Sequence, residues 1–202
     1  MKLFITGIST EVGKTVASAI VVEALQADYW KPIQAGDLDN SDSHKVESLI
    51  SNEKTVIHPN SYALNTPMSP HAAAEIDGVT IDLDAIVPPV TENHLVIEGA
   101  GGLLVPLNDT DTIFDLIRPD HKVIVVSRHY LGSINHTLCA VEAIERRGLN
   151  IAGLVISGAE HKPSEEVILS GTGVPILARL NEVKNEDLNP EKHWTWVNKE
   201  LI

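Results

Sequence analysis

The segment that most constrains this chain is residues 4–16, which read FITGISTEVGKTV. An apolar run leads into a loop that ends Gly13-Lys14-Thr15, and a helical pattern follows. This order is typical of a phosphate-binding loop, because the N–H groups of the turn and of the helix N-terminus point at an anion. Lys14 would bring positive charge to the β- and γ-phosphates, and the Thr15 hydroxyl would ligate Mg²⁺.

The spacing of this loop departs from the usual pattern. Five residues separate Gly7 from Gly13, where four are usual. An ordinary strand, turn and helix with a chance Gly-Lys-Thr triplet is therefore the alternative. The order of strand, loop and helix favours phosphate binding.

Apolar runs recur along the chain and alternate with helical patterns. The runs are residues 2–5, 95–97, 123–126 and 151–156, with a weaker one at 175–180. Their continuous apolarity is typical of strands buried on both faces of a parallel sheet. Helical spacing in residues 15–27 and 133–147 alternates with them. We therefore predict an α/β fold, a doubly wound and mostly parallel sheet with helices on both faces, in a single domain over residues 1–202.

Charge and composition exclude some functions and suggest a compartment. The net charge of −13 argues against binding nucleic acid through a broad basic surface, but a local phosphate pocket remains compatible with it. Cys139 is the single cysteine, which suits a reducing cytoplasm, and we expect it to be buried as a small apolar residue. No signal peptide and no membrane-spanning run is recognised, so we expect no membrane association and a cytoplasmic location.

Ligands of such sheets bind beyond the carboxyl ends of the strands, so the residues that follow each apolar run are the candidates. Glu98 ends one run, where it is either a Mg²⁺ ligand or a solvated acid. Lys31, after a short run, is equally open between a cation of the site and a surface lysine, whereas Asp42, in a polar loop, is the weaker candidate because acids in such loops are usually only solvated. Residues 99–102 form either a tight turn or a face for phosphate. Ser133 is expected to cap a helix that begins near Ile134.

Six motifs taken together resemble one family. They are GISTEVGKT (7–15), YWKPIQAG (29–36), NSD (40–42), SPHAAA (69–74), EGAGG (98–102) and LGSINH (131–136). In this order they resemble the dethiobiotin synthetases, the ATP-dependent ligases of the penultimate step of biotin synthesis. The extra residue in the phosphate loop is a trait of that family, which removes the objection to its spacing.

The resemblance implies a reaction and its participants. The implied reaction joins 7,8-diaminopelargonate, CO₂ and ATP, and gives dethiobiotin, ADP and phosphate. One amine forms a carbamate, the carbamate oxygen attacks the γ-phosphate, and the second amine closes the ureido ring on the mixed anhydride. The protein mainly positions reactants and neutralises charge. The family also implies a homodimer with its active sites at the interface.

The resemblance also assigns roles to residues. Lys31 matches the catalytic lysine, which bridges carbamate and γ-phosphate, and Lys14 neutralises the developing charge. Thr15, Asp42 and Glu98 look like the Mg²⁺ ligands. The nucleotide is expected to contact Thr10, Glu11, Val12, Gly13, Lys14, Thr15 and Val16 in the loop, and Asp42, Glu98, Gly99, Ala100, Gly101, Ser157, Gly158 and Asn181 elsewhere. The substrate is expected to contact Thr10, Lys31 and Ala35, and Gly132, Ser133, Ile134 and Asn135 of the partner subunit.

Two positions depart from the family pattern. Ala35 stands where the family usually has Ser or Thr, so one substrate hydrogen bond, about 0.5–1.5 kcal/mol net, is expected to be lost. Ser157 stands where an Asn often reads the adenine edge, which leaves the preference for ATP open.

Two other functions compete with this one. A nucleotide-switched ATPase of the partition or septum-positioning type shares the loop and the sheet, but it usually carries a second lysine near the start of the loop. Residues 7–12 contain none. A related ring- or amide-forming ligase that acts on another diamine or acid is the second competitor, and the altered contact at Ala35 keeps it open.

Overall fold

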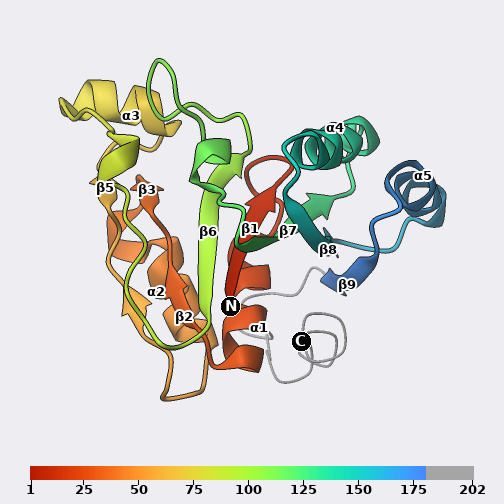
Figure 1. Cartoon of the computed structure of the whole chain (residues 1–202), viewed down its shortest axis with the longest axis horizontal. Helices are drawn as coiled ribbons and strands as arrows, with labels where there is room; N and C mark the ends of the chain where they lie inside the picture. Colours follow the sequence, from red (N-terminus) through yellow and green to blue (C-terminus); the bar gives the residue numbers. More distant parts are fainter. Residues whose placement is uncertain (181–202) are drawn as a thin grey trace.

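The computed structural model describes residues 1–180, and seven strands form one parallel sheet in it (Figure 1). Asn181 and the Trp-containing tail lie outside the described residues. In spatial order the strands are β4 (Ile57–His58), β2 (Asp28–Trp30), β6 (Leu95–Gly102), β1 (Lys2–Gly7), β7 (His121–Arg128), β8 (Asn150–Ser157) and β9 (Ile176–Leu180). The chain crosses over between parallel neighbours, as the alternation of strands and helices predicts.

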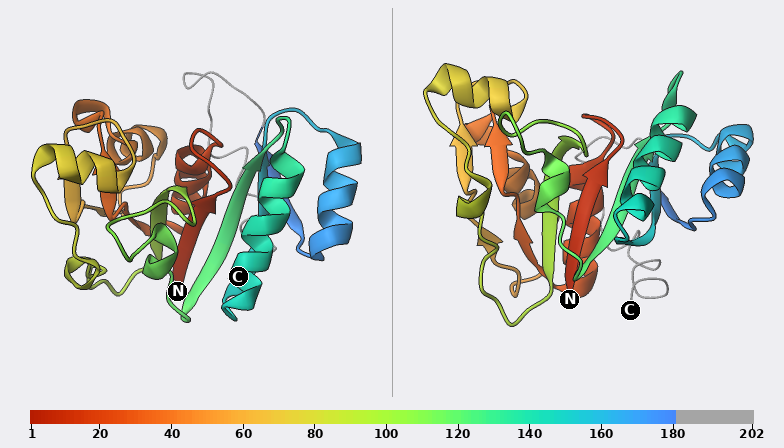
Figure 2. Two further views of the ribbon diagram at one scale, coloured as in Figure 1. Left: turned by 90° about the horizontal axis from the view of Figure 1, so that it is seen from above. Right: turned by 45° about the horizontal axis from the view of Figure 1, so that its top comes forward.

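Helices cover both faces of this sheet, because successive strand residues point to opposite sides. Leu3 and Ile5 pack in one cluster with α1 (Lys14–Leu25) and α2 (Asp42–Leu49). Phe4 packs in the other with α4 (Ser133–Arg146) and α5 (Lys162–Thr172). Figure 2 shows α4 and α5 together on one side of the sheet. The predicted doubly wound α/β fold is confirmed.

A smaller unit lies beside the edge of the main sheet. It consists of the parallel pair β3 (Ile33–Ala35) and β5 (Tyr62–Leu64) with α3 (Pro70–Asp77) against it. The close approach of Gly36 to Pro67 fixes the turn after β3, since a Cβ on Gly36 would lie 2.4 Å from the Pro67 Cβ. Three short 3₁₀ segments complete the described elements, η1 (Leu38–Asn40), η2 (Leu83–Ala85) and η3 (Ile113–Leu116).

Three local expectations differ from the structure. Residues 99–102 belong to β6, which is irregular there with Gly101 at φ 67°, and they do not form a tight turn. The N-cap of α4 is Gly132, in the left-handed region at φ 102°, and Ser133 is already the first helical residue. Cys139 is exposed, because α4 buries the side that carries Thr137, Val141 and Ile144.

Within residues 1–180, no helix has the length and apolarity to cross a membrane.

Candidate active site

The loop between β1 and α1 has the backbone of an anion cradle. Gly13 sits at φ 96° and Glu11 at φ 54°, so the chain turns back on itself just before the helix begins at Lys14. A Cβ on Gly7 would lie 2.7 Å from both the Ser9 carbonyl oxygen and a Val12 methyl, so only glycine fits there. The first N–H groups of α1 and the turn amides therefore face the same point.

Lys14 is folded into this cradle. Its side chain is 7% exposed, and its Nζ donates a hydrogen bond of 3.0 Å to the Ser9 carbonyl oxygen. Burial lowers the pKa of Lys14 to about 8, although the nearby Glu98 carboxylate opposes the shift. A bound phosphate would place negative charge beside this ammonium and so favour its protonated form.

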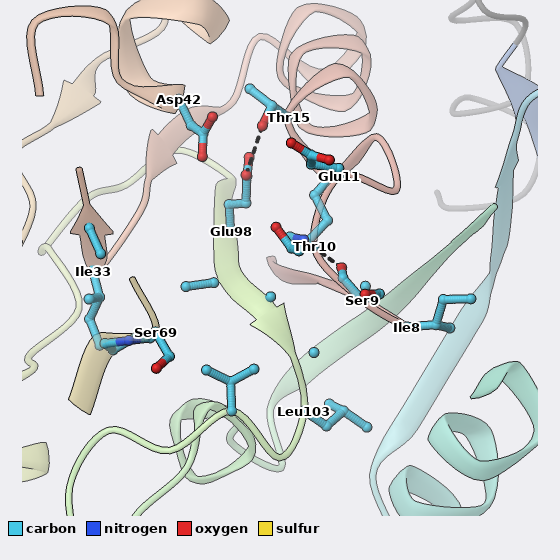
Figure 3. A pocket seen from close by; sticks show the side chains of 18 of the residues that line it. Ile8, Ser9, Thr10, Glu11, Thr15, Ile33, Asp42, Ser69, Glu98 and Leu103 are labelled. Carbon is cyan, nitrogen blue, oxygen red and sulfur yellow. Dashed lines mark hydrogen bonds between the residues drawn. The ribbon is translucent and has the colours of Figure 1, made fainter. Parts of the chain in front are cut away.

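A second group of side chains meets around Glu98, at 1% exposure in β6. Thr15 Oγ1 donates to Glu98 Oε1 at 3.1 Å, and Tyr29 OH donates to Glu98 Oε2 at 2.9 Å. The Lys31 ammonium lies 3.4 Å from Glu98 Oε1 and is hydrogen-bonded to Asp42 Oδ2. Figure 3 shows Asp42, Thr15 and Glu98 facing one another at the edge of the sheet. The two acids and the lysine, which sequence position alone left open, thus lie together.

The neighbouring charges in this group determine the protonation states of Lys31 and Asp42. Burial would lower the pKa of Lys31, but Glu98 and Asp42 together raise it above its ordinary value. Burial would raise the pKa of Asp42, but Lys31 holds it below its ordinary value. Lys31 is therefore a protonated ammonium between carboxylates.

The donor set fits a hard divalent cation. Asp42, Glu98 and Thr15 offer two carboxylates and a hydroxyl, all oxygen, beside the anion cradle. Mg²⁺ prefers such a set, completed by phosphate oxygens and waters. Residues 1–180 hold no group of three or more His, Cys, Asp and Glu side chains that could bind a metal alone. A cation here would need the nucleotide phosphates among its ligands.

One open cleft of about 1490 Å³ joins the loop, the carboxylates and the smaller sheet. Of the residues expected to bind nucleotide, metal or substrate, twelve line it: Thr10, Glu11, Gly13, Lys14, Thr15, Val16, Lys31, Ala35, Asp42, Glu98, Ala100 and Gly101.

Other expected residues lie elsewhere. Val12 is buried under the loop, and Gly99 packs against Phe4. Ser157 ends β8 behind the loop, with its Oγ 3.1 Å from where a Cβ on Gly13 would lie, and Gly158 follows it.

The expected substrate segment lies at the start of α4. Gly132, Ser133, Ile134 and Asn135 do not line the cleft of their own chain. Ser133 Oγ accepts from the backbone N–H of Tyr130 at 3.4 Å. Asn181 lies outside the described residues.

Several cleft residues were missed in the sequence. Gln34 accepts the Asp42 N–H at 3.4 Å and donates to the Gly36 carbonyl oxygen at 2.9 Å, which ties the polar loop to β3. Ser69 and His136 also line the cleft. The motifs SPHAAA and LGSINH contain both, but spacing alone did not place them there.

Comparison with known proteins identifies the family. The family described as AAA domain matches residues 1–192. The ATP-dependent dethiobiotin synthetase of Christiangramia forsetii is 61% identical over 179 residues, covering 89% of this chain and 86% of the relative. That of Cytophaga hutchinsonii is 51% identical, covering 89% and 88%. The chain belongs to the dethiobiotin synthetase family.

Solved structures place this dethiobiotin synthetase family member in a wider fold group. The septum site-determining protein MinD of Pyrococcus horikoshii, complexed with Mg-ADP, superposes with a TM-score of 0.54 at 14% identity, covering 91% of this chain and 82% of that one. A putative plasmid partition protein of Borrelia burgdorferi, bound to AMPPNP, gives 0.59 at 11%, covering 98% and 96%. At such identities the likeness shows the fold alone, so it lends no support to a partition or septum-positioning function.

Proposed function

We propose that this chain is an ATP-dependent dethiobiotin synthetase that closes the ureido ring of dethiobiotin from 7,8-diaminopelargonate and CO₂. The observation that carries the proposal is the position of Lys31, a protonated ammonium that meets Asp42 and Glu98 beside the phosphate loop. A cation there can meet both a carbamate and the γ-phosphate that it attacks.

The order of bond changes follows from the substrates. One amine of the diamine adds to CO₂ and releases a proton, giving a carbamate. A carbamate oxygen attacks the γ-phosphorus, and the bond to the bridging oxygen of ADP breaks. The second amine then attacks the carbamoyl carbon, loses a proton, and expels phosphate as the ring closes.

The chain's own residues position and neutralise charge in these steps. The amides of the loop and Lys14 hold the triphosphate, while Lys31 meets the carbamate oxygen and the transferring phosphoryl group. Thr15, Asp42 and Glu98 would hold Mg²⁺, whose charge would neutralise the β- and γ-phosphates. Because the ion would take a place near Lys31, the lysine would exchange its carboxylate partners for phosphate and carbamate oxygens.

The proposal includes a homodimer. Gly132 is the N-cap of α4 and makes no side-chain hydrogen bond, so the N–H groups of Ile134 and Asn135 are open to a ligand, whereas that of Ser133 donates to the Tyr130 carbonyl oxygen at 3.0 Å. We assign them to the substrate carboxylate of the partner's site. Leu131, next to this segment, is fully exposed in the single chain, as an interface residue would be.

The test is a direct assay. Purified protein is mixed with diaminopelargonate, bicarbonate, MgCl₂ and ATP, and phosphate release and dethiobiotin are measured. We expect both, in equal amounts and dependent on the diamine. A panel of other diamines and amino acids separates the competing ligase function. Phosphate release with another acceptor and none with diaminopelargonate would contradict the proposal.

A further inference from the structure

The hydroxyl of Tyr29 has no part in the proposed reaction, although it reaches the proposed metal site. Tyr29 lies in β2, next to β6 in the sheet, and its side chain is 0% exposed. Its hydroxyl donates to Glu98 Oε2 at 2.9 Å, from the side away from the cleft lining. In the sequence Tyr29 belongs to a short apolar run and begins the motif YWKPIQAG, but neither assigns it a role.

The two oxygens of Glu98 are thereby divided. Oε2 takes the tyrosine hydroxyl, whereas Oε1 takes both Thr15 Oγ1 at 3.1 Å and the Lys31 ammonium at 3.4 Å. Figure 3 shows the Thr15 bond to Glu98 beside Asp42. Only the oxygen on the loop side meets cleft residues.

The tyrosine can act only as a donor to this carboxylate. A carboxylate offers only acceptors, so the Tyr29 hydroxyl is the donor in the 2.9 Å bond to Glu98 Oε2. A donor held in a packed core loses little freedom when it orients its acceptor. The Asp42 carboxylate has two ammonium partners instead, the buried Lys31 at Oδ2 and the partly exposed Lys45 at 3.8 Å from Oδ1.

We propose that Tyr29 is a positioning residue that holds the Glu98 carboxylate with Oε1 toward the nucleotide and its metal ion. The inference rests on the proposed function, which makes Glu98 a Mg²⁺ ligand. Tyr29 touches neither substrate nor metal and acts through Glu98. Outer partners of metal ligands typically change metal affinity by about 10–100-fold when they are removed.

The test measures nucleotide binding rather than turnover. ADP affinity is measured by calorimetry with MgCl₂ and with EDTA, for the wild type and Tyr29→Phe. We expect Tyr29→Phe to need about tenfold more Mg²⁺ for half of the maximal gain in ADP affinity, and to bind ADP in EDTA as the wild type does. The kinetic counterpart is a higher Mg²⁺ requirement with little change in kcat at saturating Mg²⁺.

Two further variants separate positioning from loss of packing. Tyr62→Phe is the matched control, because the Tyr62 hydroxyl accepts from the Asp82 N–H at 3.0 Å outside the cleft, and it should leave the Mg²⁺ requirement unchanged. In a Glu98→Gln background, Tyr29→Phe should add little, because both changes act on one ligand.

The outcomes divide clearly. An unchanged Mg²⁺ requirement in Tyr29→Phe, or full additivity with Glu98→Gln, overturns the role of Tyr29 while leaving the metal site standing. A wild type whose ADP affinity is the same in MgCl₂ and EDTA overturns the metal site and this inference with it. Dethiobiotin formation by the wild type tests the proposed reaction separately.

Discussion

Two lysines of the cleft stand in different surroundings. Lys14 bonds to a backbone carbonyl inside the loop and has a pKa lowered to about 8, whereas Lys31 is paired with Asp42 and Glu98 and has a raised pKa. Among the described residues, Lys14 therefore has no anionic side chain as a hydrogen-bond partner, whereas Lys31 is paired with two carboxylates. Their contributions to binding and to turnover should therefore separate.

We expect Lys14→Ala to weaken ATP binding at least tenfold, since the loop loses its only point charge on the phosphates. Lys31→Ala should mainly lower kcat at saturating ATP, by about 100-fold or more, because its contacts form as charge transfers. Equilibrium binding and steady-state kinetics measure the two quantities. Lys2→Ala, which breaks an exposed pair with Asp120, is the control and should change neither. Equal loss of ATP affinity in both variants would contradict the separate roles.

The residues of the site were predictable to different degrees. Lys14 and Thr15 follow from one local segment, because a loop and the helix after it are contiguous in sequence. The site around Lys31, Asp42 and Glu98 joins three separate segments. Strand ends could nominate Lys31 and Glu98, and the motif could nominate Asp42, but sequence position could not show that the three side chains meet. The bond from Tyr29 to Glu98 depends on which strand lies next to β6, and periodicity carries no such information.

At the scale of elements, the five predicted strands and two predicted helices match β1, β6, β7, β8, β9, α1 and α4, and the errors in these elements fall at their ends. The elements β3, β4, β5, α2, α3 and α5 were not predicted, because they are short or carry a weak hydrophobic pattern. The strand predicted at residues 95–97 runs to Gly102, because glycine weakens a strand signal but allows the irregular end of β6, where Gly101 has φ 67°. Ser133 was taken as a cap because Ser is favoured there, but Gly132 can adopt a positive φ and supplies the turn instead.

The turn after β3 provides a prediction about local structure. Gly36 has φ 71° and abuts Pro67, while Gly78, which caps α3, has φ 68° with open space around it. Gly78→Ala should cost only the conformational penalty, about 1 kcal/mol, whereas Gly36→Ala adds a backbone clash of about 1–3 kcal/mol. Urea unfolding of both variants measures the difference. Equal losses in the free energy of unfolding would show that the turn after β3 can shift to accommodate a Cβ at position 36 without cost.

The link between α5 and β9 provides a prediction about pH. Arg179 donates to both oxygens of the buried Glu165, which lowers the pKa of Glu165 to about 2 from 4.5. A lowered pKa stabilises the fold above pH 4.5, and this contribution is lost as the pH falls toward 2.

Glu165→Gln should therefore lower the free energy of unfolding by about 1–2 kcal/mol at pH 7, less than the full shift implies because Arg179 is partly exposed. Urea unfolding at pH 7, 5 and 3 checks this, and the difference from wild type should shrink toward acid. A constant difference would mean that the carboxylate charge is not responsible.

At the scale of the whole molecule, the proposed dimer would combine Lys31 of one subunit with residues 132–135 of the other. Asn135→Asp adds a negative charge where the substrate carboxylate is expected, so it should be inactive, as Lys31→Ala should be. Subunits exchanged between the two variants would form mixed dimers that carry one intact site each. Activity should return to about a quarter of the wild-type level, because about half of the dimers are mixed.

The control for this exchange is each variant alone under the same treatment, with the mass of the species measured by sedimentation. Failure to regain activity in a preparation that sediments as a mixed dimer would place both residues in a site made by one subunit. A monomer that is active would contradict the dimer itself.

The pairing of Lys31 with two carboxylates also bears on side reactions. An enzyme that uses CO₂ exposes its own amines to the same chemistry as its substrate's amine, and only an unprotonated amine adds to CO₂. Because Asp42 and Glu98 raise the pKa of Lys31, its nitrogen has no free electron pair to offer. The lysine that we assign to the carbamate is thus kept from forming one itself while it is paired with these carboxylates.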